Sequence, residues 1–158
     1  MAEIQRLAAT EFTGTTTSAY APIILERSQR KEFRAYGAIL DDNMIGFAYG
    51  APCRVEDRWY QLVEPPLEAK GNEHWLEQAF TLSELHVHPA HQGRGIGSTL
   101  IKEICRNTNF HHCLLGVAEA NTRARCVYES LGYSLLCDPI RTRVGSTPFM
   151  VMGIRLPM

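Results

Sequence analysis

The feature that most constrains this chain is a glycine-rich stretch, His91 to Ser98, which reads HQGRGIGS. It follows an apolar segment ending at Val87 and precedes a segment, 98–107, whose apolar residues fall on one helical stripe. Glycines at such a strand-to-helix turn let backbone N–H groups converge on one point, and the helix adds the unpaired N–H groups of its first turn. The stretch therefore predicts a turn that binds an anion, of a kind suited to phosphates.

Three phosphate-binding patterns compete for this stretch. A P-loop requires GxxxxGK[ST], and no Gly-Lys pair follows here. A dinucleotide fingerprint requires GxGxxG, but the glycine after Gly93 and Gly95 is Gly97, which is misplaced. The pattern QxxGxG fits at every fixed position, starting from Gln92. A module that holds some other phosphate ligand through this turn is the weakest of the alternatives.

The rest of the chain predicts one α/β domain with a mixed sheet. Residues 33–40 alternate as a strand does, Asp41-Asp42-Asn43 has the chemistry of a turn, and residues 44–51 are the return strand. Asn121 and Gly132 fit the start and the end of a helix. This order of elements indicates a three-layer core. The predicted strands are 33–40, 44–51, 81–87, 113–118, 133–137 and 149–155, and the predicted helices are 18–31, 74–80, 98–107 and 121–130.

Two further segments carry expectations of their own. Residues 53–80 predict a long connection, because Pro65-Pro66 and Gly71-Asn72 are typical of turns. A connection of this length is either a functional lid or an ordinary surface insertion, and the sequence favours neither. Residues 149–155 are expected to form an apolar edge strand, which would favour a homodimer because an unpaired edge invites pairing.

Composition limits the partners and the compartment. The net charge is −1, which argues against a general nucleic-acid binder, so a polyanion must be held by a local site. No apolar run reaches the roughly 18–20 residues of a membrane helix, and the first residues lack the pattern of a secretory signal. The cysteines are odd in number and scattered, which predicts free thiols, mostly buried or half-buried, in a cytoplasmic protein. They are Cys53, Cys105, Cys113, Cys126 and Cys137.

Two segments together resemble the GNAT superfamily of N-acetyltransferases. Residues 85–97, LHVHPAHQGRGIG, are similar to its acetyl-CoA-binding motif, and residues 121–133, NTRARCVYESLGY, are similar to its later N…A…YESLGF motif. The resemblance implies a single GNAT-like domain over 1–158, with a strongly bent mixed sheet, flanking helices and a splay between strands four and five. It further implies an N-terminal acceptor-side part (1–80), a CoA-binding part (81–137) and C-terminal strands (138–158).

The resemblance also implies where the co-substrate lies. Acetyl-CoA is the expected co-substrate, and no metal is expected. The backbone of Leu85, His86 and Val87 would pair with the pantetheine arm. Asn121 and Tyr128 would lie near the pantetheine and the thioester. The residues that would cradle the pyrophosphate are Gln92, Gly93, Arg94, Gly95, Ile96, Gly97 and Ser98.

The implied reaction is direct transfer of an acetyl group from acetyl-CoA to a primary amine of a small molecule or a peptide. The amine must be neutral to attack, the carbonyl oxygen needs a donor, and the leaving thiolate needs a proton. Tyr128 stands at the family position of that acid, and a phenol with a pKa of about 10 is a competent donor. Glu84 as a base or water holder and catalysis by proximity alone, with no protein base, are the two leading alternatives, and His86 as the base ranks below both. A non-catalytic acyl-CoA-binding or sensing domain of the same fold is the alternative function.

The acceptor side is where the chain departs from the family pattern. The segment before residue 33 is short for a first strand and two helices, and the 53–80 connection is longer than the usual hairpin. Trp59, Tyr60 and Trp75 are candidate walls of an amine pocket, with nearby carboxylates to attract a cation. The competing interpretation, which we favour, is a solvated charged surface whose aromatic residues pack for stability. The carboxylates are those of Glu56, Asp57, Glu64, Glu68, Glu73 and Glu77.

The histidines carry a metal hypothesis that the sequence does not favour. His86, His88 and His91 are close in sequence, but no cysteine or carboxylate completes a site at ligand spacing. The adjacent pair His111-His112 is expected to lie in a solvated turn before the next strand.

Overall fold

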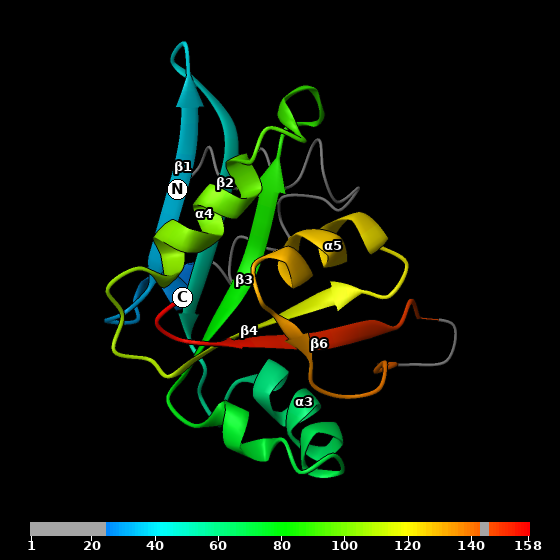
Figure 1. Cartoon of the computed structure of the whole chain (residues 1–158). Coiled ribbons are helices and arrows are strands. Elements are labelled where there is room, and N and C mark those ends of the chain that lie inside the picture. The colour runs from blue at the N-terminus through cyan, green and yellow to red at the C-terminus, as the bar shows by residue number, and fades with distance from the viewer. Residues whose placement is uncertain (1–24, 143–145) are drawn as a thin grey trace. The chain divides into compact units, whose positions relative to one another are not determined.

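The chain folds into a six-stranded mixed sheet with flanking helices, as the sequence predicts (Figure 1). The computed structural model describes residues 25–142 and 146–158. The strand order is β1-β2-β3-β4-β6-β5. The strands are β1 (Arg34–Leu40), β2 (Asn43–Pro52), β3 (Ala79–Val87), β4 (His112–Ala118), β5 (Ser134–Leu135) and β6 (Phe149–Arg155). The helices are α3 (Arg58–Glu68), α4 (Ile96–Cys105) and α5 (Thr122–Ser130), and the 3₁₀ helices are η2 (Glu73–Leu76) and η3 (Pro89–His91).

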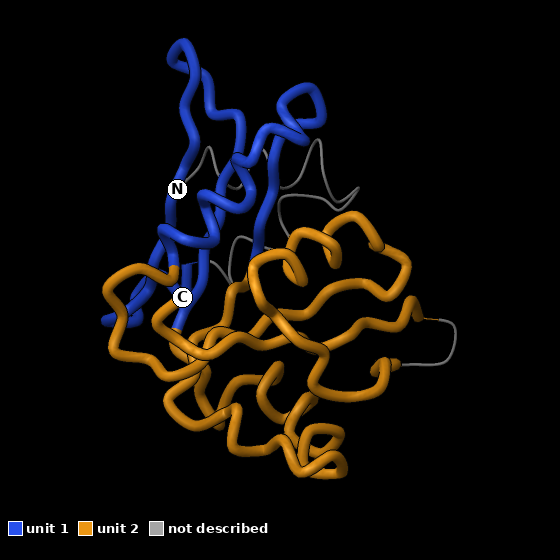
Figure 2. The backbone as a smooth tube through the Cα atoms, in the orientation of Figure 1, with its two compact units in different colours: residues 1–51, 84–104 blue, residues 52–83, 105–158 orange. Residues whose placement is uncertain are grey.

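The chain divides into two compact units (Figure 2). Unit 1 comprises residues 1–51 and 84–104, and unit 2 comprises residues 52–83 and 105–158. Within each unit the strands are not strongly curled, so the strong bend that the resemblance implied is not confirmed. The splay of the sheet and the division of one domain into three functional parts stay predictions. Of the helices that the structure describes, none combines the length and the apolar character that a membrane span requires.

β1 and β2 of unit 1 form the predicted hairpin and pair antiparallel. The two turn residues, Asp41 and Asp42, have φ angles of 49° and 61°. A two-residue turn in which both φ angles are positive matches the right-handed twist of the strands that it joins. Aspartate tolerates this conformation better than most residues, because its short side chain bonds to the local backbone. The turn therefore sets the register that the hairpin adopts.

The α4 helix covers one face of unit 1. A methyl group at Gly97, in the first turn of α4, would touch the side chains of Leu85 and Val87. These two residues of β3 therefore face the helix. Because side chains alternate along a strand, Glu84 and His86 lie on the opposite face. Unit 1 thus separates the packing residues of β3 from its titratable ones.

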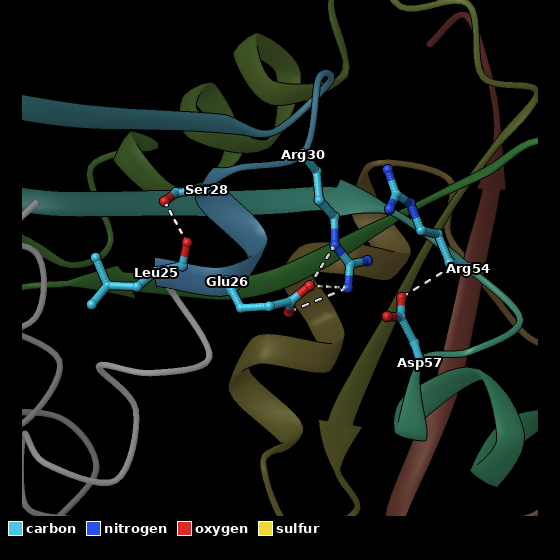
Figure 3. A network of polar contacts seen from close by, with 6 residues as sticks. All are labelled: Leu25, Glu26, Ser28, Arg30, Arg54 and Asp57. Carbon is cyan, nitrogen blue, oxygen red and sulfur yellow. Dashed lines mark hydrogen bonds and ion pairs between the residues drawn. The ribbon is translucent and has the colours of Figure 1, made fainter.

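Short-range polar contacts hold the segments just before β1 and α3 (Figure 3). Residues 25–28 are helical, so the helix predicted over 18–31 ends three residues early. Its start, and the first strand of the family pattern, lie outside the described residues. The contacts drawn in Figure 3 include Ser28 Oγ to the Leu25 carbonyl (2.8 Å), Arg30 Nη2 to Glu26 Oε1 (3.0 Å) and the Arg54 N–H to Asp57 Oδ2 (3.1 Å).

β6 is an internal strand of unit 2, not the edge strand that the sequence predicts. It pairs antiparallel with β4 over its whole length and with β5 on its other side. β5 is shorter than predicted, but its two residues hydrogen-bond to the side of β6 that was expected to be open. The homodimer expected through residues 149–155 therefore loses its basis.

Residues 58–68 form α3, where the sequence predicts an irregular connection. Pro65 and Pro66 lie in its C-terminal half, where each removes one backbone donor. The helix forms nevertheless, because Val63 and Leu67 are fully buried in the core of unit 2. Burial of two such side chains contributes about 3–6 kcal/mol, enough to outweigh the lost hydrogen bonds. The segment is an ordered helical layer, and neither the lid nor the surface-insertion hypothesis describes it.

The helix predicted over 74–80 is wrong in its second half. η2 ends at Leu76, and β3 begins at Ala79, two residues earlier than predicted. Gln78 has a φ of 45°, which breaks the helix before the strand starts. β3 then pairs in parallel with β4 over Ala79–Leu82. The apolar residues of 74–80, which resemble the stripe of one helix, are therefore divided between η2 and β3.

Two helices cover opposite faces of β4 and β6 in unit 2 (Figure 1). Leu114 and Val151 pack in one cluster with α3. On the other face, a methyl group at Gly132, just after α5, would touch Ile154. Gly132 has a φ of 96° and ends α5 as predicted. β4 is thus buried on both faces, as its apolar sequence indicates.

Candidate active site

The glycine turn of unit 1 connects β3 to α4, as predicted. Gly93 and Gly95 have φ angles of 76° and 81°, the left-handed region that favours glycine. A methyl group at Gly95 would find no atom within 4 Å. The turn therefore needs glycine for its backbone conformation, and it leaves open space beside that backbone. α4 begins directly after it, at Ile96.

The first turn of α4 presents donors to this open space. The Thr99 N–H donates to the Gly95 carbonyl over 3.0 Å, which is the first hydrogen bond of the helix. The N–H groups of Ile96, Gly97 and Ser98 precede that bond, so the helix offers them no internal acceptor. Donors at a helix N-terminus, with the dipole behind them, favour an anion. The turn has the chemistry of a phosphate cradle.

Gln92 serves the turn itself. Its Nε2 donates to the carbonyl of Val87 over 2.9 Å, and the side chain is half-buried. This bond ties the start of the turn to the last residue of β3. The geometry therefore indicates that Gln92 holds the turn in position. Arg94 is the exposed charged side chain of the turn.

Glu84 and His86 form a pair on the face of β3 opposite α4. His86 Nε2 and Glu84 Oε2 are 2.8 Å apart. The side chains are 13% and 24% exposed, so both are partly shielded from water. The imidazole lies against Phe47 of β2, with the two ring centroids 5.1 Å apart. The structure thus joins the two residues that the sequence offers as alternative bases.

The histidines of the β3–α4 connection have separate roles. His88 Nδ1 accepts from the Ala90 N–H over 3.2 Å and so caps η3. His91 lies 5.7 Å from His88 between ring centroids, and its Nδ1 is buried without a hydrogen-bond partner among the described residues. Within residues 25–142 and 146–158, no group of three or more potential ligands has the geometry of a metal site.

Unit 2 carries the two remaining candidates on α5. Asn121 caps the helix as predicted, because its Oδ1 accepts from the Ala124 N–H over 3.1 Å. Tyr128 is 8% exposed, and its ring centroid lies 5.8 Å from that of Tyr133. The structure therefore places Asn121 at the start of the helix and Tyr128 on its buried side.

A thiol–phenol cluster beside Tyr128 was not predicted. The Tyr133 hydroxyl donates to Cys113 Sγ over 3.2 Å and lies 3.9 Å from Cys105 Sγ. Burial, and then the neighbouring thiol of Cys113, raise the pKa of Tyr133 far above its ordinary value. The cluster is held neutral and structural, and no local pattern could predict it because its members are far apart in the chain.

The aromatic residues of the 53–80 segment pack against the core of unit 2. Trp59, Tyr60 and Trp75 are half-buried against the cluster that α3 and η2 form with β4 and β6. Burial, followed by the Glu64 carboxylate, raises the pKa of Tyr60. These contacts agree with the interpretation that we favoured, in which the aromatics serve stability. An amine pocket lined by these aromatic residues stays a prediction.

His112 is not the solvated residue that the sequence predicts. It is the first residue of β4, it is half-buried, and its ring centroid lies 4.8 Å from that of Trp75. Its Nδ1 is 3.1 Å from the carbonyl oxygen of Glu77. Burial is the main cause that lowers the pKa of His112. The expectation failed because the register of β4 places this residue under the Trp75 ring.

The cysteines are free, and most are buried, as predicted. Cys105, Cys113 and Cys137 are buried, Cys53 is half-buried, and Cys126 is exposed.

The sequence was compared with models of known protein families. The acetyltransferase (GNAT) family matches over residues 1–133. GCN5-like protein acetyltransferase Rv2170 of Mycobacterium tuberculosis is 29% identical over 123 residues, which is 73% of this chain and 60% of that protein. The chain therefore spans less than two thirds of that relative's length.

Solved structures share the fold. Ribosomal-protein-alanine N-acetyltransferase of Brucella melitensis matches with a TM-score of 0.66 at 17% identity, covering 98% of this chain and 91% of that one. The acetyltransferase yncA of Salmonella typhimurium, solved with its cofactor acetyl-CoA, matches with a TM-score of 0.64 at 16% identity, covering 99% of this chain and 85% of that one. Identities this low concern the fold alone. The match over residues 1–133 goes further: the chain belongs to the acetyltransferase (GNAT) family.

Proposed function

We propose that the chain transfers an acetyl group from acetyl-CoA to a primary amine by direct attack in a ternary complex. The observation that carries the proposal is the β3–α4 turn, where two left-handed glycines precede the free donors of a helix. The open space at Gly95 fits a phosphate that approaches the backbone closely. Family membership supplies the co-substrate that this cradle would hold.

The turn and the end of β3 would hold acetyl-CoA. The N–H groups of residues 93–98 would bind the pyrophosphate, with the exposed Arg94 adding a positive charge. The backbone of Leu85, His86 and Val87 would bind the pantetheine arm in the manner of an added strand. Asn121 would lie near the same arm. Acetyl-CoA supplies the acetyl group as a thioester, and the residues of the chain orient it.

Two side chains would move the protons of the reaction. Glu84 would take one proton from the ammonium form of the acceptor, directly or through a water molecule, which leaves a neutral amine to attack. A backbone N–H would stabilise the oxygen of the tetrahedral intermediate. Tyr128 would give its phenolic proton to the departing thiolate. The Tyr128 oxygen then regains a proton from the acetylated nitrogen or from water, so the enzyme returns to its initial state.

The acceptor is a primary amine of a small molecule or of a protein. Rv2170 is named a protein acetyltransferase, and the Brucella protein is named for an alanine of a ribosomal protein. These names put peptides with free N-termini or lysine side chains first in a screen. Polyamines, aminoglycosides and amino acids are the other classes to include. A cytoplasmic location belongs to the same proposal, since five free cysteines suit a reducing compartment.

The test is acetylation of a panel of amines, read by mass spectrometry of the product. With an amine that is acetylated, Tyr128→Phe should lower kcat by about 10²–10⁴-fold, because it removes a proton donor. The dissociation constant for acetyl-CoA, measured by calorimetry, should stay unchanged. Tyr36→Phe, at an exposed tyrosine of β1, is the matched control. A Tyr128→Phe variant as active as the wild type would contradict the acid role.

A second function is favoured by the burial of Tyr128. Its ring packs beside Tyr133 and is 8% exposed, which also suits a purely structural residue. The chain would then be a non-catalytic acyl-CoA-binding or sensing domain. Acetyl-CoA binding without product from any amine would support this second function. Calorimetry that shows binding of ATP or NAD, but not of CoA or acetyl-CoA, would overturn both functions.

A further inference from the structure

We propose that His86 is a positioning residue that orients the Glu84 carboxylate for proton transfer, so that the pair acts as one unit. The inference rests on the proposed function. Glu84 and His86 are then not alternative bases, because each has a different role in the same proton transfer. Glu84 takes the proton, and His86 fixes the carboxylate that takes it.

The pair is formed by the strand itself. Residues two apart on a strand point to the same face, and β3 places Glu84 and His86 on the face opposite α4. Nε2 and Oε2 are 2.8 Å apart, which is a hydrogen bond of good length. His86 is the one hydrogen-bond partner found for the Glu84 carboxylate among the described residues. Its other oxygen, Oε1, therefore remains for the substrate.

His86 is packed both at its ring and at its backbone. Phe47, which is fully buried, lies against one side of the imidazole at 5.1 Å between ring centroids. A methyl group at Gly46 would come within 3.0 Å of the His86 carbonyl oxygen, so β2 also packs closely on its backbone. A ring held on its face and at its backbone has few orientations left. The position of its Nε2 is thus fixed, and the hydrogen bond from Nε2 orients the Glu84 carboxylate.

The chemistry of the pair follows from this geometry. In the neutral ring, the hydrogen bond assigns the proton to Nε2, which donates to Oε2. One proton of the substrate ammonium passes to Oε1, giving a neutral amine and a protonated Glu84, while the bond from Nε2 persists. Glu84 later releases the proton to water. A carboxylate held in one rotamer avoids the entropy loss of being ordered during the reaction.

The experiment compares three substitutions of His86 in steady-state acetylation of an amine that the wild type accepts. His86→Phe keeps a ring against Phe47 and removes the donor, and it should lower kcat by about 10- to 100-fold, as for the loss of a hydrogen bond to a charged group. The KM for acetyl-CoA should stay unchanged. His86→Gln retains a donor of similar reach and should recover most of kcat. His86→Asn, whose amide is too short to reach Oε2, should not. His111→Gln, at an exposed histidine, is the control.

A double-mutant cycle tests whether His86 acts through Glu84. In a Glu84→Gln background, His86→Phe should change kcat by less than about twofold, because coupled residues are not additive. Equal effects of His86→Phe in both backgrounds would overturn the inference, and so would equal rates for the Gln and Asn variants. The Gln–Asn contrast serves alone if His86→Phe fails to fold. A wild-type chain that acetylates no amine would overturn the proposed function and this inference together, whereas an active wild type with unchanged His86 variants would overturn the inference alone.

Discussion

The β3–α4 turn of unit 1 and the packing around Gly153 of unit 2 both depend on glycine, for opposite reasons. At Gly95 a methyl group would meet nothing, and the constraint is a φ of 81°. At Gly153 a methyl group would lie 2.7 Å from Leu136 Cδ1 and 3.0 Å from the Trp75 ring. The first glycine leaves open space beside its backbone, and the second is closely packed by its neighbours. Substitutions should therefore affect binding in one region and stability in the other.

The largest expected effect is on the unit 2 side. Trp75 lies over Gly153 and against His112, so Trp75→Ala leaves a cavity between η2 and the sheet. We expect the free energy of unfolding to fall by about 3 kcal/mol. Urea unfolding followed by circular dichroism measures this. Glu73→Ala, at an exposed residue of η2, should change stability by less than about 0.5 kcal/mol. A loss of the same size in both variants would show that Trp75 does not anchor the segment.

Gly153→Ala should come next. The added methyl group would overlap Leu136 and the Trp75 ring, and relieving such overpacking costs about 2 kcal/mol. Thermal unfolding measures the loss, and the affinity for acetyl-CoA of the folded fraction should not change. Gly37→Ala is the control, because its methyl group would meet only the flexible end of Met44 at 3.4 Å. If Gly153→Ala is as stable as Gly37→Ala, the close packing at Gly153 is not a constraint.

Gly95→Ala should lower the affinity for acetyl-CoA and leave stability nearly unchanged, the reverse of Gly153→Ala. Forcing alanine into the left-handed region costs about 1–2 kcal/mol. The turn should relax away from this conformation, which lowers the affinity for acetyl-CoA about tenfold and changes the melting temperature little. Calorimetry and thermal unfolding together measure the two effects. Gly97→Ala, whose methyl group would make ordinary contacts at 3.8 Å and 3.9 Å, serves as the stability control. Unchanged affinity in Gly95→Ala would mean that the turn is not the cradle.

The smallest effect concerns pH and belongs to unit 2. Burial lowers the pKa of His112 below its usual 6.5, with smaller lowering effects from His111, His74 and Arg155, while the Glu77 carbonyl acts in the opposite direction. The unfolded chain therefore binds a proton more readily than the folded chain. Stability from this residue is complete above about pH 6.5 and is lost as the pH falls through the lowered folded-state pKa.

His112→Gln should remove this pH dependence. The test compares the urea midpoints of the variant and the wild type between pH 7.5 and pH 5, where the wild type should lose more stability on acidification. His111→Gln, at the exposed neighbour, should keep the slope of the wild type. Parallel curves for His112→Gln and the wild type would show that His112 titrates alike in both states.

Local patterns predicted most of the fold. The hairpin turn at Asp41-Asp42, the cap at Asn121 and the end of α5 at Gly132 depend on residues close in sequence, and all three are confirmed. α3 was missed because Pro65-Pro66 is typical of loops, whereas burial of its apolar face decides the outcome. The place of β6 in the sheet was also missed, since strand order is set by long-range pairing.

The candidate site was likewise predictable where it depends on local patterns and not where it depends on side-chain geometry or long-range register. The glycine turn follows from spacing, and the alternation of β3 places Glu84 and His86 on one face. Their mutual hydrogen bond needed side-chain geometry that no pattern records. The burial of His112 under Trp75 depends on a register between distant segments, and so the sequence could not predict it.

The exposed thiol of Cys126 on α5 has a practical consequence. It lies two residues before Tyr128 and is the exposed cysteine in the part of the chain that the structure describes. A thiol-reactive dye that reports released CoA will also label Cys126, and this gives each chain a background signal of its own. The same reactivity makes Cys126 an attachment point for a fluorophore on the exposed side of α5, the helix whose buried side carries Tyr128. Acetyl-CoA binding could then be followed by fluorescence without introducing a new cysteine.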